Sequence, residues 1–169
     1  MQKFVEFPIE EWEKRLDPFA FFGQGAIAYA KTNDKENGLT ISWGSLGMLW
    51  RKRVVTVYVH ATRYSKGIFD NANTFSVMSF GGGYQKELAY FGSKSGAVTN
   101  KAKDCSFHVA YDEDAPYFEE AEIVIIAKKI GQSDFDKNHV DAGVKSWYES
   151  SGVHTIYQGE IVKVLKKVK

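Results

Sequence analysis

The chain has 169 residues, of which 44% are hydrophobic and 25% are charged, and this composition fits one folded domain over residues 1–169. Lys and Arg (22) almost balance Asp and Glu (21), which excludes the broad basic face that nucleic-acid binding needs. A single cysteine, Cys105, excludes an internal disulfide and fits a reducing, cytoplasmic compartment. The longest apolar run covers only residues 123–127, and a membrane span needs about 20, so we expect no membrane partner.

Predicted elements in the first third of the chain are one short helix followed by strands. A helix over Ile9–Leu16 follows Pro8. Strands are predicted over Ala26–Ala30 and Leu39–Trp43, with Asn37-Gly38 as the turn of a hairpin between them. The next strand, Val54–His60, is rich in valine. This part of the chain therefore predicts antiparallel β structure.

Further along, strands alternate with short helices. Gly92 is a plausible helix end, and the acidic residues Asp112–Asp114 predict a hairpin tip. The predicted helices are Lys66–Asn73, Tyr84–Phe91, Ala97–Asp104 and a looser stretch over Asp134–Ser150, and the predicted strands are Thr74–Phe80, Phe118–Ile130 and Thr155–Leu165. Irregular strands with a few short helices indicate a mainly β fold, a barrel or sandwich with helices at its ends.

Side chains that usually carry proton transfer or bind metals show no ordered pattern. The four histidines are far apart in the sequence, and the HExxH and GxSxG motifs are absent. Glu120 and Glu122 have the period-2 spacing of an exposed strand face. We therefore assign no catalytic side chain and no metal ligand.

Three polar segments are more informative. In the segment 40–47, Thr40 and Ser42 point to the same side of a strand, and Gly44 and Gly47 permit close approach of a ligand to the backbone. The segment 62–65 places Arg63, a planar donor suited to phosphate, where a strand meets a helix.

The third segment, residues 92–96, brackets hydroxyl residues with glycines, and Lys101 follows it. Each segment alone also fits an ordinary strand end, a capped helix or a linker. Together, the three segments indicate a site for an anionic ligand.

The order of these motifs resembles the flavin reductase-like proteins with an FMN-binding split barrel, and the flavoredoxin-type members most of all. The matching stretches are TISWGSLG, a valine-rich strand ending in TRYS, and FGSKSG followed by a lysine. The resemblance covers roughly residues 26–101, with weaker matches at 115–119 and 157–160. The chain departs from the family pattern in the loop 95–101, which lacks an Arg and two Asp.

The resemblance implies a six-stranded Greek-key split β-barrel with a few short peripheral helices, a homodimer, and FMN held near the subunit interface. It further implies cofactor-binding roles for twelve residues. These are Thr40, Ser42, Trp43, Gly44, Ser45, Arg63, Tyr64, Ser65, Ser93, Ser95, Gly96 and Lys101.

Three hypotheses about function follow from the resemblance. The first is an oxidoreductase that passes hydride from NADH or NADPH to the flavin. The second is an FMN electron-transfer protein that a partner protein reduces, and the third is a flavin-binding module without turnover. Because the cofactor carries the chemistry in such proteins, none of the three requires a catalytic side chain from the chain itself.

Overall fold

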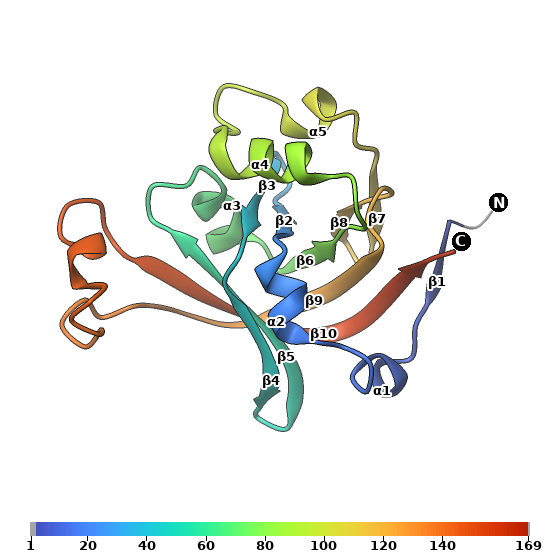
Figure 1. Cartoon of the computed structure of the whole chain (residues 1–169), viewed down its shortest axis with the longest axis horizontal. Coiled ribbons are helices and arrows are strands. Elements are labelled where there is room, and N and C mark those ends of the chain that lie inside the picture. The colour runs from blue at the N-terminus through green and yellow to red at the C-terminus, as the bar shows by residue number, and fades with distance from the viewer. Residues whose placement is uncertain (1–2, 169) are drawn as a thin grey trace.

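The fold is mainly β, as the sequence predicts. The computed structural model describes residues 3–168, with 42% strand and 20% helix (Figure 1). Eight strands form one sheet in the order β3-β2-β6-β9-β10-β5-β4, and β1 pairs with β10. The strands of this sheet are β1 (Phe4–Glu6), β2 (Ala26–Lys31), β3 (Glu36–Ile41), β4 (Gly44–Leu49), β5 (Lys52–His60), β6 (Thr74–Ser79), β9 (Ile123–Asp134) and β10 (His154–Lys167).

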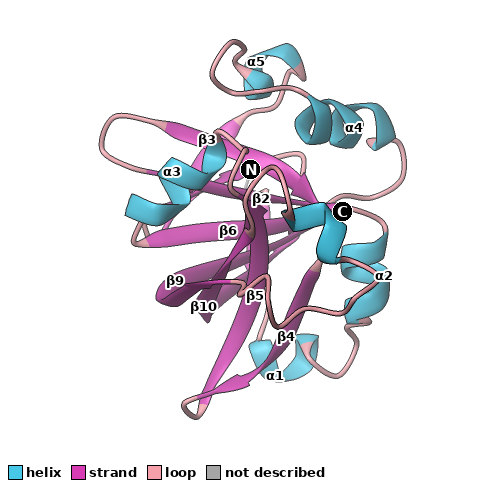
Figure 2. Ribbon diagram, turned by 90° about the vertical axis from the view of Figure 1, so that its left-hand side faces the viewer, coloured by secondary structure: helices cyan, strands magenta, loops and turns pink. Residues whose placement is uncertain are grey.

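The remaining elements are short. A separate hairpin pairs β7 with β8, and five α-helices and one 3₁₀ helix, η1, connect the strands. Their bounds are α1 (Ile9–Trp12), α2 (Pro18–Gly23), α3 (Ser65–Asn71), α4 (Gln85–Ser93), α5 (Lys101–Asp104), β7 (Val109–Asp112), β8 (Ala115–Phe118) and η1 (Lys145–Tyr148). Figure 2 shows α4 and α5 together beyond one end of the sheet, with α1 and α2 along its side.

The two edges of the main sheet are neighbours in the chain. Only Ser42 and Trp43 separate the edge strand β3 from the other edge strand β4. From the end of β3 to the start of β4 the chain makes three Cα–Cα steps, which span at most about 11 Å, so the sheet must curl until its edges approach each other there. Among residues 3–168 no pairing closes β3 onto β4, so a closed six-stranded Greek-key barrel stays a prediction.

Alternating side chains divide the core into two parts. Along β2, Ala26, Ala28 and Ala30 face the inner core, whereas Ile27 and Tyr29 face an outer core. The same alternation continues along β6 and β9, as expected for a strand with side chains on both faces. Since both faces of these strands are covered, their sequences read as continuous apolar runs.

The outer core lies beneath the helices that carry the third polar segment. Phe91 of α4 and Phe118 of β8 are fully buried there and meet edge to face at 5.4 Å between ring centroids. Phe107, just after α5, packs against both rings. Aromatic packing therefore fixes α4 and α5 on the sheet, and the loop between them is held at a defined place.

The predicted hairpin between the first two long strands exists, but its turn is elsewhere. Residues 32–35 form the turn, with the Thr32 amide donating to the Lys35 carbonyl at 2.7 Å. Asn37 and Gly38 lie inside β3, opposite Ala30 and Tyr29. A side chain at position 38 would meet the Tyr29 ring at 2.3 Å, so this glycine is required by packing and not by a turn.

Three other predicted elements differ from the structure. The helix predicted over 97–104 is helical only in α5, and residues 96–98 form a turn. The predicted strand over residues 118–130 is two strands, β8 and β9, with a bend between them that Glu119 and Ala121 stabilise through backbone hydrogen bonds. The predicted loose helix over 134–150 is almost entirely irregular, with only the short η1 at residues 145–148. The acidic hairpin tip is confirmed, because β7 and β8 are joined at residues 113–114.

Candidate functional site

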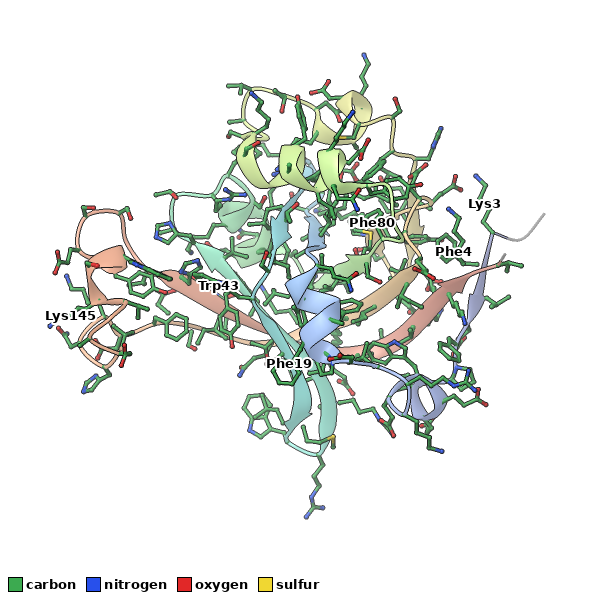
Figure 3. All side chains as sticks on the ribbon, in the orientation of Figure 1. Lys3, Phe4, Phe19, Trp43, Phe80 and Lys145 are labelled. Atoms are coloured by element: carbon green, nitrogen blue, oxygen red, sulfur yellow. The ribbon has the colours of Figure 1, made fainter. Side chains whose placement is uncertain are left out.

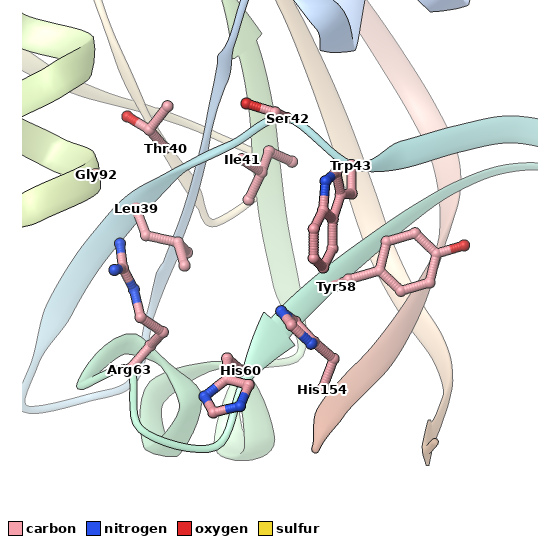
Figure 4. Close-up of a pocket in the computed structure, with 10 residues that line it drawn as sticks. All are labelled: Leu39, Thr40, Ile41, Ser42, Trp43, Tyr58, His60, Arg63, Gly92 and His154. Atoms are coloured by element: carbon pink, nitrogen blue, oxygen red, sulfur yellow. The ribbon is translucent and has the colours of Figure 1, made fainter. Parts of the chain in front are cut away.

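A cleft opens where three strand ends and one helix end meet. It has a volume of about 320 Å³. Figure 4 shows the end of β3, Trp43, the end of β5, the start of β10 and Arg63 around it. The residues that line it are Leu39, Thr40, Ile41, Ser42, Trp43, Tyr58, His60, Arg63, Gly92 and His154. We call this space the ring cleft, because aromatic side chains form much of its wall.

A second cleft adjoins the first at Arg63. It has a volume of about 210 Å³ and lies between the segment 62–65 and the loop that joins α4 to α5. Hydroxyl groups of Ser65, Ser93 and Ser95 belong to its lining residues, together with Lys101. We call it the anion cleft. Since Arg63 borders both clefts, one elongated ligand can occupy them together.

Two cations without acidic partners give the anion cleft its charge. Neither Arg63 nor Lys101 forms an ion pair with any residue in the described range 3–168. Burial and the nearby charge of Arg63 lower the pKa of Lys101 to about 8, and burial also lowers the pKa of Arg63. Two uncompensated, partly desolvated cations are costly, and a bound anion would relieve that cost.

Backbone carbonyls hold Lys101 in place. Its side chain is 3% exposed, and Nζ donates to the carbonyls of Gly38 and Phe91. The ammonium also lies 5.2 Å from the centroid of the Phe91 ring. These contacts join β3, α4 and α5 at one point. Lys101 therefore holds the loop of the anion cleft in place and also gives the cleft a positive charge.

Asn37 is a residue of this site that sequence reasoning missed. Its side chain is buried, and Nδ2 donates to Ser65 Oγ at 2.7 Å. A Cβ on Gly96 would approach the Asn37 side chain to 2.4 Å, so the glycine allows the loop to close over the amide. Because the Asn-Gly pair suggested a turn, sequence reasoning gave the Asn37 side chain no role in the site. In the structure this side chain joins the second and third polar segments.

A group of histidine and aromatic side chains forms one end of the ring cleft. His154 packs against the Trp43 ring at 4.9 Å and against the His60 ring at 4.8 Å between centroids. Trp147, from the segment between β9 and β10, stacks on Trp43 at 5.8 Å and 15°. Figure 3 shows Trp43 facing this segment, which projects from the sheet. The sequence analysis left these histidines out of the site, because their positions become adjacent only when β5 pairs with β10.

Hydrogen bonds define the tautomer of the neutral His60 ring. His60 Nε2 lies 3.1 Å from the Gly152 carbonyl, which can only accept, so Nε2 carries the proton and Nδ1 accepts from Thr62 Oγ1 at 2.8 Å. The Nδ1 of His154 lies 3.1 Å from Tyr148 Oη. Burial, and secondarily His60, lower the pKa of His154 to about 4, so His154 is uncharged at neutral pH.

Ten of the twelve residues that the sequence predicted for cofactor binding line the two clefts. Thr40, Ser42 and Trp43 line the ring cleft, Arg63 borders both, and Tyr64, Ser65, Ser93, Ser95, Gly96 and Lys101 line the anion cleft. Thr40 and Ser42 point to the same side, as predicted (Figure 4). The hydroxyl of Thr40 donates to the Leu88 carbonyl at 2.6 Å, so it anchors α4 against β3.

The structure places the other two predicted residues, Gly44 and Ser45, outside the lining of both clefts. They lie in β4, opposite Val57 and Thr56. A Cβ on Gly44 would overlap the Phe22 ring at 2.2 Å, so this glycine serves the packing of α2. Among the described residues, the group that approaches Gly44 this closely is a phenylalanine ring.

Within residues 3–168, no group of three or more His, Cys, Asp and Glu side chains is placed to hold a metal ion. The same residues contain no helix that is long and apolar enough to cross a membrane.

No family model and no curated protein matches this sequence. Solved structures do resemble its fold. An FMN-binding domain of a flavin reductases-like enzyme from Shewanella baltica OS155 has a TM-score of 0.72 at 12% identity, and the match covers 98% of this chain and 78% of that one. Flavoredoxin from Methanosarcina acetivorans has a TM-score of 0.67 at 20% identity, and the match covers 83% of this chain and 66% of that one, slightly under two thirds.

A third similar structure is the NADH:FAD oxidoreductase from Streptomyces globisporus C-1027, which has a TM-score of 0.63 at 16% identity. That match covers 96% of this chain and 86% of the other. These likenesses show that the protein shares the fold of flavoredoxin and of FMN-binding flavin reductase-like domains. This is the fold that the three ordered motifs predicted.

Proposed function

We propose that this protein binds FMN and acts as an oxidoreductase that transfers hydride from NADH or NADPH to the flavin. The observation that carries the proposal is the pair of uncompensated cations, Arg63 and Lys101, at the junction of the two clefts. A phosphate group satisfies both, and hydroxyl residues surround the place where it would lie. An aromatic-walled cleft next to a phosphate site suits a planar ring joined to a phosphate.

The residues present fit such a cofactor. Arg63, Lys101 and the serines of the anion cleft would hold the phosphate, and Trp43 and Tyr58 would pack against the ring system in the ring cleft. When bound, the flavin supplies the hydride-accepting chemistry. The protein binds, orients and partly desolvates it, and the neutral His154 adds no charge at that end of the cleft.

Names of structural neighbours support an oxidoreductase of this kind. One neighbour is described as an NADH:FAD oxidoreductase and another as an FMN-binding domain of a flavin reductases-like enzyme. Each name describes that protein alone. Applied to this chain, they favour a flavin as the redox group and a nicotinamide dinucleotide as the electron donor.

A second candidate function is electron transfer by bound FMN that a partner protein reduces. The loop 95–101 favours it, because Ala97 and Val98 stand where the family pattern has charged residues, and Val98 is 81% exposed. Positions 97 and 98 therefore offer no charged group for a dinucleotide phosphate. A neighbouring structure is itself a flavoredoxin.

The phosphate assignment is tested by comparing FMN with riboflavin. A charge-assisted hydrogen bond contributes about 1.5–3 kcal/mol, or roughly ten- to 150-fold in affinity. We expect FMN to bind more tightly by such a factor and Arg63→Ala to remove most of the preference, as measured by quenching of flavin fluorescence. Arg53→Ala is the matched control, because Arg53 pairs with Glu13 and Glu10 and lies outside the lining of both clefts. Equal affinity of the wild type for both flavins would remove the phosphate assignment.

The choice between reductase and electron carrier requires anaerobic mixing. FMN-loaded protein is mixed with NADH or NADPH while the flavin absorbance is followed. Bleaching well above the rate without protein is expected for a reductase, with weak binding of the nicotinamide. If neither nucleotide bleaches the flavin while dithionite does so reversibly, the electron-transfer function replaces the reductase.

We also propose that the protein is a homodimer. Phe19 of α2 is 89% exposed, and Met48 and Trp50 at the β4–β5 turn are 68% and 66% exposed. Large apolar side chains are seldom this exposed together unless they meet a partner. A second copy is the partner that the fold resemblance favours.

A further inference from the structure

The position of one wall of the ring cleft depends on a segment outside the sheet. Trp43 lines the cleft from the two-residue connection between β3 and β4, and its side chain is nearly half-exposed. Its indole packs against His154 at 4.9 Å and stacks on Trp147 at 5.8 Å between centroids, with 15° between the Trp43 and Trp147 planes. Trp147 is not among the residues that line the cleft. Any effect of Trp147 on a ligand in the cleft must therefore act through Trp43.

Trp147 belongs to an unusually long connection between two strands. Residues 135–153, which we call the strap, join β9 to β10 and contain only the short η1. Connections longer than about 12–15 residues are uncommon in a compact domain and are usually functional. The strap projects from the sheet (Figure 1), and of its side chains, all within the described residues, Tyr148 alone is buried. Little apolar burial therefore stabilises the strap itself, and its place against Trp43 calls for an explanation in function.

Tyr148 anchors the strap at the ring cleft. Its ring stacks on those of Phe135 and His60, at 6.3 Å and 6.5 Å between centroids. Its Oη lies 3.1 Å from Nδ1 of His154. Both histidines line the ring cleft. Because Trp147 directly precedes Tyr148 in η1, this anchor also determines where the Trp147 indole lies.

We propose that Trp147 is a positioning residue for flavin binding, which holds the Trp43 indole as the wall against which the flavin ring packs. The proposal rests on the proposed flavin site. An indole without this support samples several rotamers, and ordering it when the ligand arrives costs free energy. The stack with Trp147 orders Trp43 before the ligand binds. The gain concerns the ring system alone, because the phosphate is assigned to the anion cleft.

The test measures binding of FMN and riboflavin to Trp147→Ala, Trp147→Phe and the wild type by fluorescence titration and stopped flow. We expect Trp147→Ala to weaken both flavins by the same factor, roughly two- to tenfold, the range of one aromatic pair. Trp147→Phe should restore most of the affinity, because phenylalanine can still stack on Trp43. Lys145→Ala is the matched control, since it removes an exposed side chain of the same η1, and it should leave both affinities unchanged.

A double-mutant cycle with Trp43→Ala separates positioning from an independent effect. If Trp147 acts through Trp43, adding Trp147→Ala to Trp43→Ala causes no further loss of affinity, whereas independent effects add. Additive losses would overturn the proposal, and so would unchanged flavin affinities in Trp147→Ala. A loss for FMN without a loss for riboflavin would also overturn it, because the effect would then lie at the anion cleft. A wild type that binds neither flavin would instead remove the proposed function itself.

Discussion

At the scale of single residues, the site is defined by charges that the protein leaves without acidic partners. Lys101 is the most deeply buried of them, and within residues 3–168 its hydrogen bonds go to backbone carbonyl groups. Most buried lysines gain an acidic neighbour or lose their proton. Here the two cations, Arg63 and Lys101, lie together, so the free protein is expected to be less stable than its complex with an anionic ligand.

The buried Lys101 predicts a rise in stability at alkaline pH. Its pKa is about 8 in the folded protein and 10.5 as the ordinary value, so the unfolded chain binds more protons between these two pH values. Stability therefore rises from about pH 8 to 10.5, by an amount on the order of 2–3 kcal/mol. Urea denaturation at a series of pH values should show this slope in the free protein and its loss in Lys101→Met. Loss of the same slope in Lys86→Met, which removes an exposed lysine of α4, would contradict the assignment.

Sequence reasoning at this scale found residues that line the clefts where they lie in a recognisable local pattern. Arg63 and Ser65 were predicted from a strand that runs into a helix, and both line the anion cleft. It failed where the position of a residue depends on contacts between segments that are distant in the sequence. Asn37 was assigned to a turn but contacts Ser65, and His154 reaches the ring cleft only through the pairing of β10 with β5.

At the scale of elements, glycines in the same strand have different roles. In β4, a Cβ on Gly44 would lie 2.2 Å from the Phe22 ring of α2, whereas a Cβ on Gly47 would meet nothing within 4 Å. Gly44 therefore sets how closely α2 approaches the sheet. Gly47 has no comparable contact.

This difference predicts unequal effects of the same substitution. Gly44→Ala is expected to lower the free energy of unfolding by about 1–3 kcal/mol, because the methyl group overpacks against the ring. Gly47→Ala should change it by less than about 0.5 kcal/mol. Chemical denaturation of the two variants checks the prediction, and a larger loss in Gly47→Ala than in Gly44→Ala would refute it.

Elements were best predicted where the apolar pattern is long and continuous. The strands predicted at 54–60 and 155–165 are present as β5 and β10, with ends shifted by a few residues. The short strands β1 and β4 were not predicted. β1 has only three residues and β4 contains two glycines, so neither shows a clear alternation of apolar and polar residues. The segment 134–150 was predicted as a loose helix, but it is held by contacts such as the Trp43–Trp147 stack, which are tertiary.

At the scale of the whole molecule, the β4–β5 hairpin projects from the sheet (Figure 1). The exposed apolar side chains of Met48 and Trp50 lie near its tip. Its turn residues, Trp50 and Arg51, both have positive φ, at 49° and 61°. Such turns favour Asn and Gly. A tryptophan kept there despite strain and exposure supports a role at an interface with a second copy.

The dimer prediction is tested by sedimentation velocity at micromolar concentration with FMN present. We expect a particle of twice 19.1 kDa, and Trp50→Ser together with Met48→Ser should shift the equilibrium toward monomer, since both remove apolar interface area. Trp147→Ser, which removes a half-exposed tryptophan of the segment between β9 and β10, is the control. A 19.1 kDa wild-type particle would overturn the dimer.

The connection of the two sheet edges through Ser42 and Trp43 has a consequence for the order of folding. The hairpins β2–β3 and β4–β5 are local and should close early, whereas β5 must find β10, with His60 opposite His154, across most of the chain. Contacts between segments distant in sequence form slowly, because the chain entropy of closing a long loop is lost first. The ring cleft forms only when both the local hairpins and the distant β5–β10 pairing are in place. Flavin added to a refolding chain should therefore bind only in the slowest phase. The change in its fluorescence would then report the rate of the last folding step.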